Sequence, residues 1–216
     1  MTSSRPVDEK EYLHARLRGV RDILLWKLDG LSDADIRRPM TSSGTNLLGL
    51  VKHVMGSETN YLGETFGRPA SQSGIRMPWW EGGSGLDGAD MYAVPGESTE
   101  YIVDLYRRSC AHADQTITEL SLDDIGAVPH SGEKLTLRQA LVHTILETGH
   151  HAGHADIVRE LIDGSIGGRG DMDRIYTDDK TGETWRAVPD EARRREIYER
   201  VAASAAAAEQ ASNGRR

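Results

Sequence analysis

The sequence predicts an all-α fold: a four-helix bundle with a long loop between its second and third helices and a C-terminal extension. In four segments, apolar residues recur every three or four positions, which is the spacing of a helix with one buried face. Stretches rich in glycine, serine and proline separate these segments. With 216 residues, of which 38% are hydrophobic and 28% charged, the chain can bury one core of about 150–170 residues and carry appendages.

The first two helices are expected over residues 9–31 and 47–66. The apolar stripe of the first helix consists of Leu13, Leu17, Val20, Leu24, Leu25 and Leu28. The second helix begins directly after Ser42–Asn46, because serine, threonine and asparagine side chains cap helix N-termini. The long loop, residues 67–96, contains Trp79 and Trp80. Loops of this length in compact domains are often functional, so we consider this pair a wall of a substrate site, with a plug at one end of the bundle as the alternative.

The third helix is expected over residues 98–120 and the fourth over residues 136–163, followed by Gly164 as a C-terminal stop. The bundle thus covers residues 8–164. In the extension, residues 165–216, we expect a hairpin over 175–185, a charged, alanine-rich helix over 190–208 and a frayed end.

Composition excludes several classes of function. A net charge of −8 argues against a nucleic-acid partner, because phosphate binding requires a basic surface. The single cysteine, Cys110, excludes an intrachain disulfide and a cysteine-rich zinc site. The N-terminus has no apolar signal segment, and no apolar run approaches the ~20 residues that span a bilayer. We therefore expect a cytoplasmic protein without a membrane partner.

Metal-ligating residues are concentrated in the fourth helix. Four of the eight histidines and one glutamate lie within the twelve residues 143–154, namely His143, Glu147, His150, His151 and His154. At about 100° per residue, and with Glu147 at zero, His151 lies near +40°, His154 near −20°, His143 near −40° and His150 near −60°. The apolar positions that define the expected buried face lie between about +20° and +80°: Leu137, Ala140, Ala155, Val158 and Ile162.

Glu147 and His151 therefore share the apolar face, one turn apart. Arg138, Asp156 and Arg159 mark the opposite, polar side, although Val142 and Ile145 also fall there. An ionised glutamate that faces a core without a partner costs several kcal/mol.

A divalent metal bound by the Glu/His pair would remove this cost. A third ligand must come from another helix, and His53 is the best candidate; His14, His112 and His130 have less suitable surroundings. A buried hydrogen-bond network of the same residues is the alternative.

At these residues the sequence resembles the DinB-like superfamily, and most closely its actinobacterial branch of proteins related to mycothiol-dependent enzymes. The resemblance covers residues 12–164. The similar segments are Leu24–Leu31, Ser43–His53, Leu137–His143, Glu147–Asp156 and Arg159–Gly164.

The resemblance implies a four-helix bundle that holds one divalent metal, zinc or nickel. In the mycothiol-dependent maleylpyruvate isomerases of this superfamily, the ligand pattern is a histidine of the second helix and Glu-x-x-x-His of the fourth. The matching residues are His53, Glu147 and His151; a site of three histidines would have to use His150 with His154. The chain departs from the family in its tail and its long loop. No motif for binding a thiol can be matched to residues of this sequence.

The implied activity is that of a mycothiol or bacillithiol S-transferase, or of a thiol-dependent isomerase, with a thiol such as mycothiol and a small electrophile as substrates. His154 and His143 are expected beside the metal, to orient a ligand or relay a proton. Two alternatives are a metal-dependent hydrolase and a bundle that binds a metal or small ligand without turnover. A homodimer formed through helix faces is compatible with such a bundle.

Overall fold

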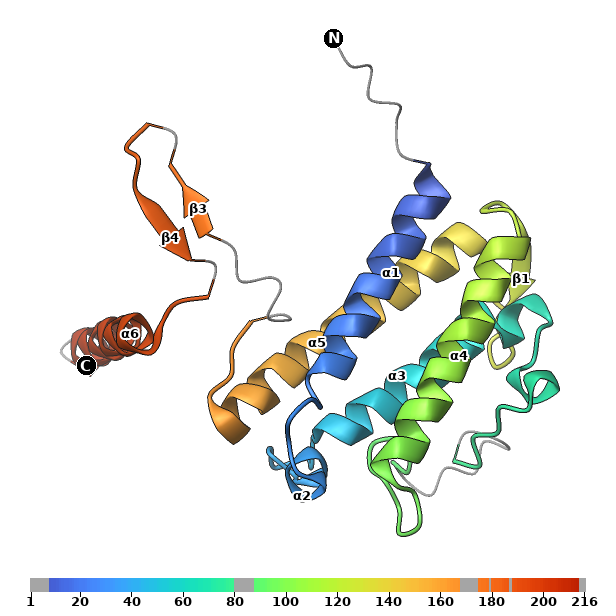
Figure 1. Ribbon diagram of the computed structural model, residues 1–216, viewed down its shortest axis with the longest axis horizontal. Helices are drawn as coiled ribbons and strands as arrows, with labels where there is room; N and C mark the ends of the chain where they lie inside the picture. Colours follow the sequence, from blue (N-terminus) through green and yellow to red (C-terminus); the bar gives the residue numbers. More distant parts are fainter. Residues whose placement is uncertain (1–7, 80–87, 168–174, 179, 187, 214–216) are drawn as a thin grey trace. The chain divides into compact units, whose positions relative to one another are not determined.

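Four long helices form a bundle, as the sequence predicts. They are α1 (Glu9–Trp26), α3 (Leu47–Leu62), α4 (Thr99–Glu119) and α5 (Leu137–Asp163). Helix α3 packs against α4 and α5, and α1 packs against α5 (Figure 1). The structure is a computed structural model that describes residues 8–79, 88–167, 175–178, 180–186 and 188–213. It divides into two compact units, Met1–Ile166 and Gly167–Arg216.

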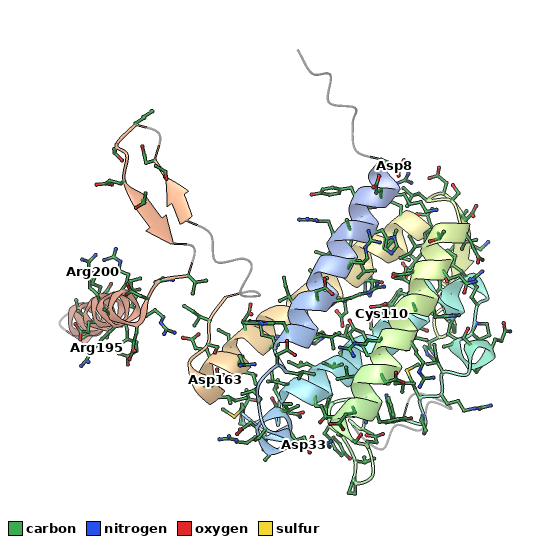
Figure 2. The ribbon with its side chains drawn as sticks, in the orientation of Figure 1. Asp8, Asp33, Cys110, Asp163, Arg195 and Arg200 are labelled. Atoms are coloured by element: carbon green, nitrogen blue, oxygen red, sulfur yellow. The ribbon has the colours of Figure 1, made fainter. Side chains whose placement is uncertain are left out.

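Polar side chains define the helix termini. Asp8 and Asp33 stand at the N-termini of α1 and of the short helix α2 (Asp33–Arg37), and Asp163 stands at the end of α5 (Figure 2). Helix α5 begins with a capping box, in which the side chains of Thr136 and Gln139 accept hydrogen bonds from each other's backbone N–H. It ends at Gly164, whose φ of 75° suits glycine.

Two helices are shorter than their apolar patterns predict. Helix α1 ends at Trp26 rather than near residue 31, because the carbonyl groups of Lys27 and Asp29 accept hydrogen bonds from the Arg159 guanidinium of α5 instead of from a continuing helix. Helix α3 ends at Leu62, and Glu64–Phe66 forms a 3-10 turn, η1, after Gly63. At α1 a tertiary contact replaces the last turn of the predicted helix, and at α3 a local turn after Gly63 does.

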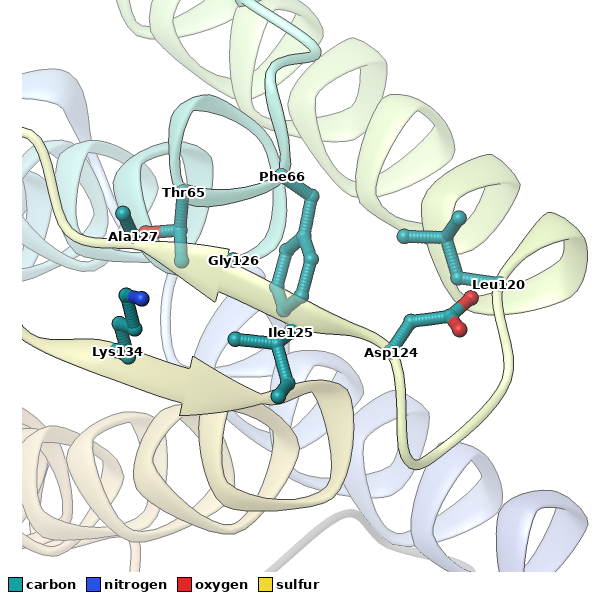
Figure 3. Close-up of a pocket in the computed structure, with 8 residues that line it drawn as sticks. All are labelled: Thr65, Phe66, Leu120, Asp124, Ile125, Gly126, Ala127 and Lys134. Atoms are coloured by element: carbon teal, nitrogen blue, oxygen red, sulfur yellow. The ribbon is translucent and has the colours of Figure 1, made fainter.

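A short hairpin precedes α5. Strands β1 (Ile125–Ala127) and β2 (Lys134–Thr136) are antiparallel, with Gly126 opposite Leu135. A Cβ at Gly126 would lie 2.3 Å from the carbonyl oxygen of Thr65, so glycine lets the hairpin lie against η1. Between them is an open pocket (Figure 3), which is lined by Thr65, Phe66, Leu120, Asp124, Ile125, Gly126, Ala127 and Lys134.

The second unit contains the expected hairpin and helix. Strands β3 (Ile175–Thr177) and β4 (Thr184–Arg186) pair antiparallel, and helix α6 spans Glu191–Asn213. Within the part of the chain that the structure describes, no helix combines the length and the apolar composition needed to cross a bilayer.

Candidate metal centre

Helices α3 and α5 bring together the three side chains that the sequence suggested as metal ligands. One ligand atom from each of His53, Glu147 and His151 lies within 4.8 Å of the others. Glu147 Oε1 is 3.3 Å from His53 Nε2 and 3.3 Å from His151 Nε2. The two imidazole rings meet edge to face, with their centroids 4.7 Å apart. The side chains are part-buried, with 26%, 29% and 12% of their surfaces exposed, so the site is open to a small ligand.

Asp90 orients His53, and nothing in the sequence pattern pointed to it. Its Oδ2 lies 2.7 Å from His53 Nδ1. Since a carboxylate only accepts hydrogen bonds, Nδ1 of His53 carries the proton and donates it to Asp90. In the neutral ring, Nε2 then presents its lone pair toward Glu147. Carboxylate–histidine pairs of this kind fix the tautomer and the ring orientation of metal-ligating histidines in proteins.

The segment that carries Asp90 is attached to the first turns of α3. The carbonyl of Met91 accepts a hydrogen bond from the side-chain amide of Asn46, the residue that caps α3. A Cβ at Gly49 would lie 1.8 Å from that same carbonyl oxygen, so only glycine permits this close approach. One turn later, the buried Lys52 ammonium donates to the carbonyl of Tyr92 at 2.8 Å. These contacts place Asp90 beside His53.

His154 contacts the other ligand ring of α5. Its Nδ1 lies 3.3 Å from His151 Nδ1, and one of these two nitrogens carries the shared proton. When His151 donates, its Nε2 presents a lone pair toward Glu147, as His53 Nε2 does. In that tautomer a carboxylate oxygen and two imidazole lone pairs converge at one point, as three ligands of a metal do. With a proton on Nε2, either ring donates a hydrogen bond to Glu147 instead.

The pKa directions of Glu147 and His151 are those that favour metal binding. Partial burial and the neighbouring His53 lower the pKa of His151, so an extra proton on this ring is disfavoured. Burial raises the pKa of Glu147, but His151 and His53 outweigh that effect and leave it below its usual value. Glu147 is thus ionised and His151 neutral at neutral pH, which are the forms that bind metals.

The remaining histidines of the cluster lie around these three residues. The ring of His143 stacks at a tilt on Tyr61, with centroids 3.9 Å apart. His150 is exposed, and its ring meets the edges of His151 and His154. Outside the cluster, His14 contacts Asp114 and His112 contacts the carbonyl of Arg68, so both have structural partners.

Trp79, one of the two tryptophans considered as a substrate wall, is buried in the core, and its ring lies 4.0 Å from the Lys52 ammonium. Trp80 lies outside the described residues. A role of this pair in substrate binding stays a prediction.

Two features of the polar face of α5 differ from the helical projection. Arg159, which the projection placed on the solvent side, is only 7% exposed, because it bridges to the carbonyl groups after α1 and to Asp163. Asp156 forms an ion pair with the buried Lys27 rather than facing solvent alone. The buried face of α5 is therefore wider than its apolar residues indicate, and Glu147 and His151 lie at its edge.

Comparison with known proteins identifies the family and the fold. The family described as mycothiol-S-transferase matches residues 12–164. No curated protein matches the chain. Among solved structures, a crystal structure of a conserved protein from Enterococcus faecalis is similar with a TM-score of 0.58 at 15% sequence identity, covering 74% of this chain and 99% of that one. Since the family match spans the bundle and all three candidate ligands, this chain belongs to the mycothiol S-transferase family of DinB-like proteins.

Proposed function

We propose that the protein is a metal-dependent S-transferase that joins a low-molecular-weight thiol, mycothiol in the first instance, to a small electrophile. The observation that carries the proposal is Glu147 Oε1 placed 3.3 Å from the Nε2 atoms of both His53 and His151, in a chain of this family. A thiol-dependent isomerase would use the same site, with the thiol released again at the end of the reaction.

In this proposal His53, Glu147 and His151 hold one divalent metal. Two imidazole nitrogens and one carboxylate oxygen suit zinc, and nickel is the second candidate. Three protein ligands leave a position open for the thiol. A metal bound there supplies the positive charge that lowers the pKa of a neighbouring thiol and makes thiolate available near neutral pH.

The chain's own residues prepare the thiol and its surroundings. Asp90 holds His53 in the tautomer with Nε2 free, and His154 holds His151 through the Nδ1 contact. Of the two further histidines, we favour His154 over His143 as the group that takes the thiol proton to solvent, because His154 is exposed and contacts a ligand ring. The thiolate sulfur then forms a bond to the electrophilic carbon, and the leaving group departs with its bonding electron pair.

The test combines metal analysis with thiol dependence. We expect the protein purified without chelator to contain one zinc or nickel per chain, and added metal to raise the melting temperature of the stripped protein. A concentration 100 times the dissociation constant would stabilise it by about 2.7 kcal/mol. Consumption of a haloaromatic electrophile should require both the metal and mycothiol.

Two outcomes would replace the proposal. Metal-dependent consumption of an ester or amide without any thiol would indicate a hydrolase, in which water occupies the open position. Absence of bound metal together with absence of metal-induced stabilisation would refute both enzymatic readings and leave a bundle that binds small ligands without turnover.

A further inference from the structure

Helix α3 is buried along its whole length except at two residues. Within Leu47–Leu62, every side chain is buried but those of His53 and Tyr61, which are part-exposed. The two residues are eight positions apart, which corresponds to about 12 Å along the helix axis. His53 belongs to the candidate metal centre. Tyr61 is therefore the one other side chain that α3 presents at the surface.

Both residues meet α5, which lies beside α3, at part-exposed side chains (Figure 1). His53 contacts Glu147 and His151. The ring of Tyr61 packs at a tilt on that of His143, with centroids 3.9 Å apart. The two helices are antiparallel, because the later residue of α3 meets the earlier residue of α5. The aromatic pair Tyr61–His143 thus lies next to the metal centre, since His143 is one turn, or about 6 Å along the axis, from Glu147.

The opposite direction along this edge of the α3–α5 interface is closed. Toward the N-terminus of α3, the carbonyl of Met91 lies so close to Gly49 that a Cβ there would be 1.8 Å from its oxygen. One turn later, the ammonium of the buried Lys52 binds the carbonyl of Tyr92. A molecule whose sulfur occupies the open position of the metal centre can therefore extend toward the aromatic pair, and not toward the start of α3.

The aromatic pair has polar atoms that the described part of the chain does not use. Within the residues that the structure describes, the hydroxyl of Tyr61 and the ring nitrogens of His143 form no hydrogen bond. A tyrosine hydroxyl donates and accepts, and a neutral imidazole has one donor and one acceptor nitrogen. A ligand hydroxyl group also donates and accepts, so it can pair with each of these atoms in either tautomer of His143. The ring faces can meanwhile pack on the C–H surface of the same ligand.

The charges beside the aromatic pair favour an uncharged ligand. Asp90 and Glu147 place two carboxyl groups at the neighbouring metal centre, and the chain as a whole has a net charge of −8. Among the residues described by the structure, no lysine or arginine forms an ion pair with either of these carboxylates. The carboxylates of a ligand would thus meet like charge and no arginine or lysine partner.

We propose that Tyr61 and His143 bind the uncharged, hydroxyl-rich part of the thiol substrate and thereby determine which thiol is accepted. The inference rests on the proposed function, in which the sulfur of that thiol occupies the open position of the metal centre. Mycothiol has this chemistry, because its sulfur is carried by an uncharged unit rich in hydroxyl groups. Glutathione is a matched contrast, because the rest of that molecule bears carboxylates.

Steady-state kinetics of the metal-loaded protein tests the assignment. Tyr61→Leu removes the hydroxyl and the ring face, so KM for mycothiol should rise at least about tenfold while kcat changes less. Tyr61→Phe keeps the ring and should give an intermediate KM. Tyr101→Leu, at a tyrosine of α4 that is 41% exposed, is the matched control and should behave like the original chain. An unchanged KM for mycothiol in Tyr61→Leu would overturn the proposal.

A truncated thiol separates ligand binding from an effect on the metal centre. N-acetylcysteine has the sulfur but lacks the hydroxyl-rich unit, so its KM should change by less than about twofold in Tyr61→Leu. An equal rise for both thiols would mean that the substitution disturbs the metal centre, and would overturn the assignment.

Ligand binding without turnover provides a second readout. S-methyl mycothiol cannot form a thiolate, so its binding to the metal-free protein depends on the rest of the molecule. Calorimetry should show that Tyr61→Leu and His143→Leu each weaken this binding at least about tenfold. The zinc affinity of Tyr61→Leu should equal that of the original chain, which checks that the fold and the ligands are intact. Equally tight binding of S-methyl mycothiol to all three proteins would overturn the proposal.

The same experiments distinguish the failure of this inference from the failure of the proposed function. If the original chain consumes its electrophile without any thiol, the proposed function fails, and the binding of S-methyl mycothiol still tests the aromatic pair. If the reaction requires mycothiol and Tyr61→Leu has the same KM, the assignment of the aromatic pair fails alone. With glutathione we expect kcat/KM at least about tenfold below that with mycothiol; equal use of the two thiols would overturn the preference for an uncharged ligand.

Discussion

Two glutamates of the bundle, Glu58 and Glu147, point from neighbouring helices toward other helices, and they differ in the groups that contact their carboxylates. Glu58 on α3 is fully buried and meets a permanent cation: Arg21 of α1 donates from Nε at 3.1 Å and from Nη2 at 2.5 Å. Arg21 also donates from Nη1 to Asp114 of α4 at 2.6 Å. Glu147 on α5 meets two imidazole rings instead of a guanidinium.

This difference distinguishes a structural carboxylate from a candidate metal ligand. Burial alone would lower the pKa of Arg21, but Glu58 and its other neighbours raise it. The guanidinium therefore stays charged and supplies the positive charge beside Glu58. Around Glu147 the contacting groups are imidazoles, whose charge depends on their protonation, and the site is part-exposed, so an ion can reach it. Both groups depend on α3, which directs His53 toward α5 and Glu58 toward α1.

The largest effect on folding is expected from Arg21→Met. The substitution leaves Glu58 buried without its cation, which costs about 3–5 kcal/mol in comparable buried pairs. Urea denaturation should show this loss. The double variant Arg21→Met/Glu58→Gln should recover part of it, and its metal stoichiometry should equal that of the original chain. An unchanged stability of Arg21→Met would mean that the ion pair between Arg21 and Glu58 does not stabilise the fold.

At the metal centre we expect a loss of metal binding with little loss of stability. Glu147→Gln and His151→Ala should each abolish stoichiometric metal binding, because each removes one of three protein ligands. The stability of the metal-free protein should change by less than about 1 kcal/mol, since neither side chain is fully buried. His150→Ala is the control from the same helix and should bind metal normally. Loss of binding in His150→Ala, with retention in Glu147→Gln, would favour the site of three histidines.

Asp90→Asn should have an intermediate effect. An asparagine can still contact His53 but no longer selects the tautomer with Nε2 free, and losses of such supporting groups typically cost 10–100-fold in metal affinity. Titration calorimetry with zinc measures this directly. Asp104→Asn, on the exposed face of α4, is a suitable control. Equal affinities of both variants would show that Asp90 does not position His53.

The smallest expected effect is the pH-dependent contribution of Asp114, the second partner of Arg21, to the free energy of unfolding. Burial raises the pKa of Asp114, but Arg21 and His14 outweigh burial and leave it below its usual value. A carboxyl group whose pKa is lowered in the folded state stabilises the protein above its unfolded pKa of about 3.9, and loses this contribution as the pH falls through the folded value. Because Asp114 is 32% exposed, we expect about 1 kcal/mol after allowance for solvent screening. Asp114→Asn should show this deficit in urea denaturation at pH 7 and much less of it at pH 3; an equal deficit at both would exclude the ionic origin.

The sequence predicted the helices well because each one has a stripe of apolar residues at helical spacing and a local capping residue at its start. It also placed Glu147 and His151 on one side of α5, since their separation of four residues depends only on helix geometry. It misassigned Arg159 to solvent, because its hydrogen-bond acceptors are the carbonyl groups of Lys27 and Asp29, more than a hundred residues away.

By itself, then, the sequence determined the bundle and the face of α5 from which a glutamate and a histidine reach toward α3. Only the tertiary structure decided which groups complete the site. Asp90 has no periodic pattern around it, and its place beside His53 depends on the close contact of Met91 with Gly49. Local spacing follows from the backbone geometry of one helix, whereas the partner of a side chain follows from how distant segments pack.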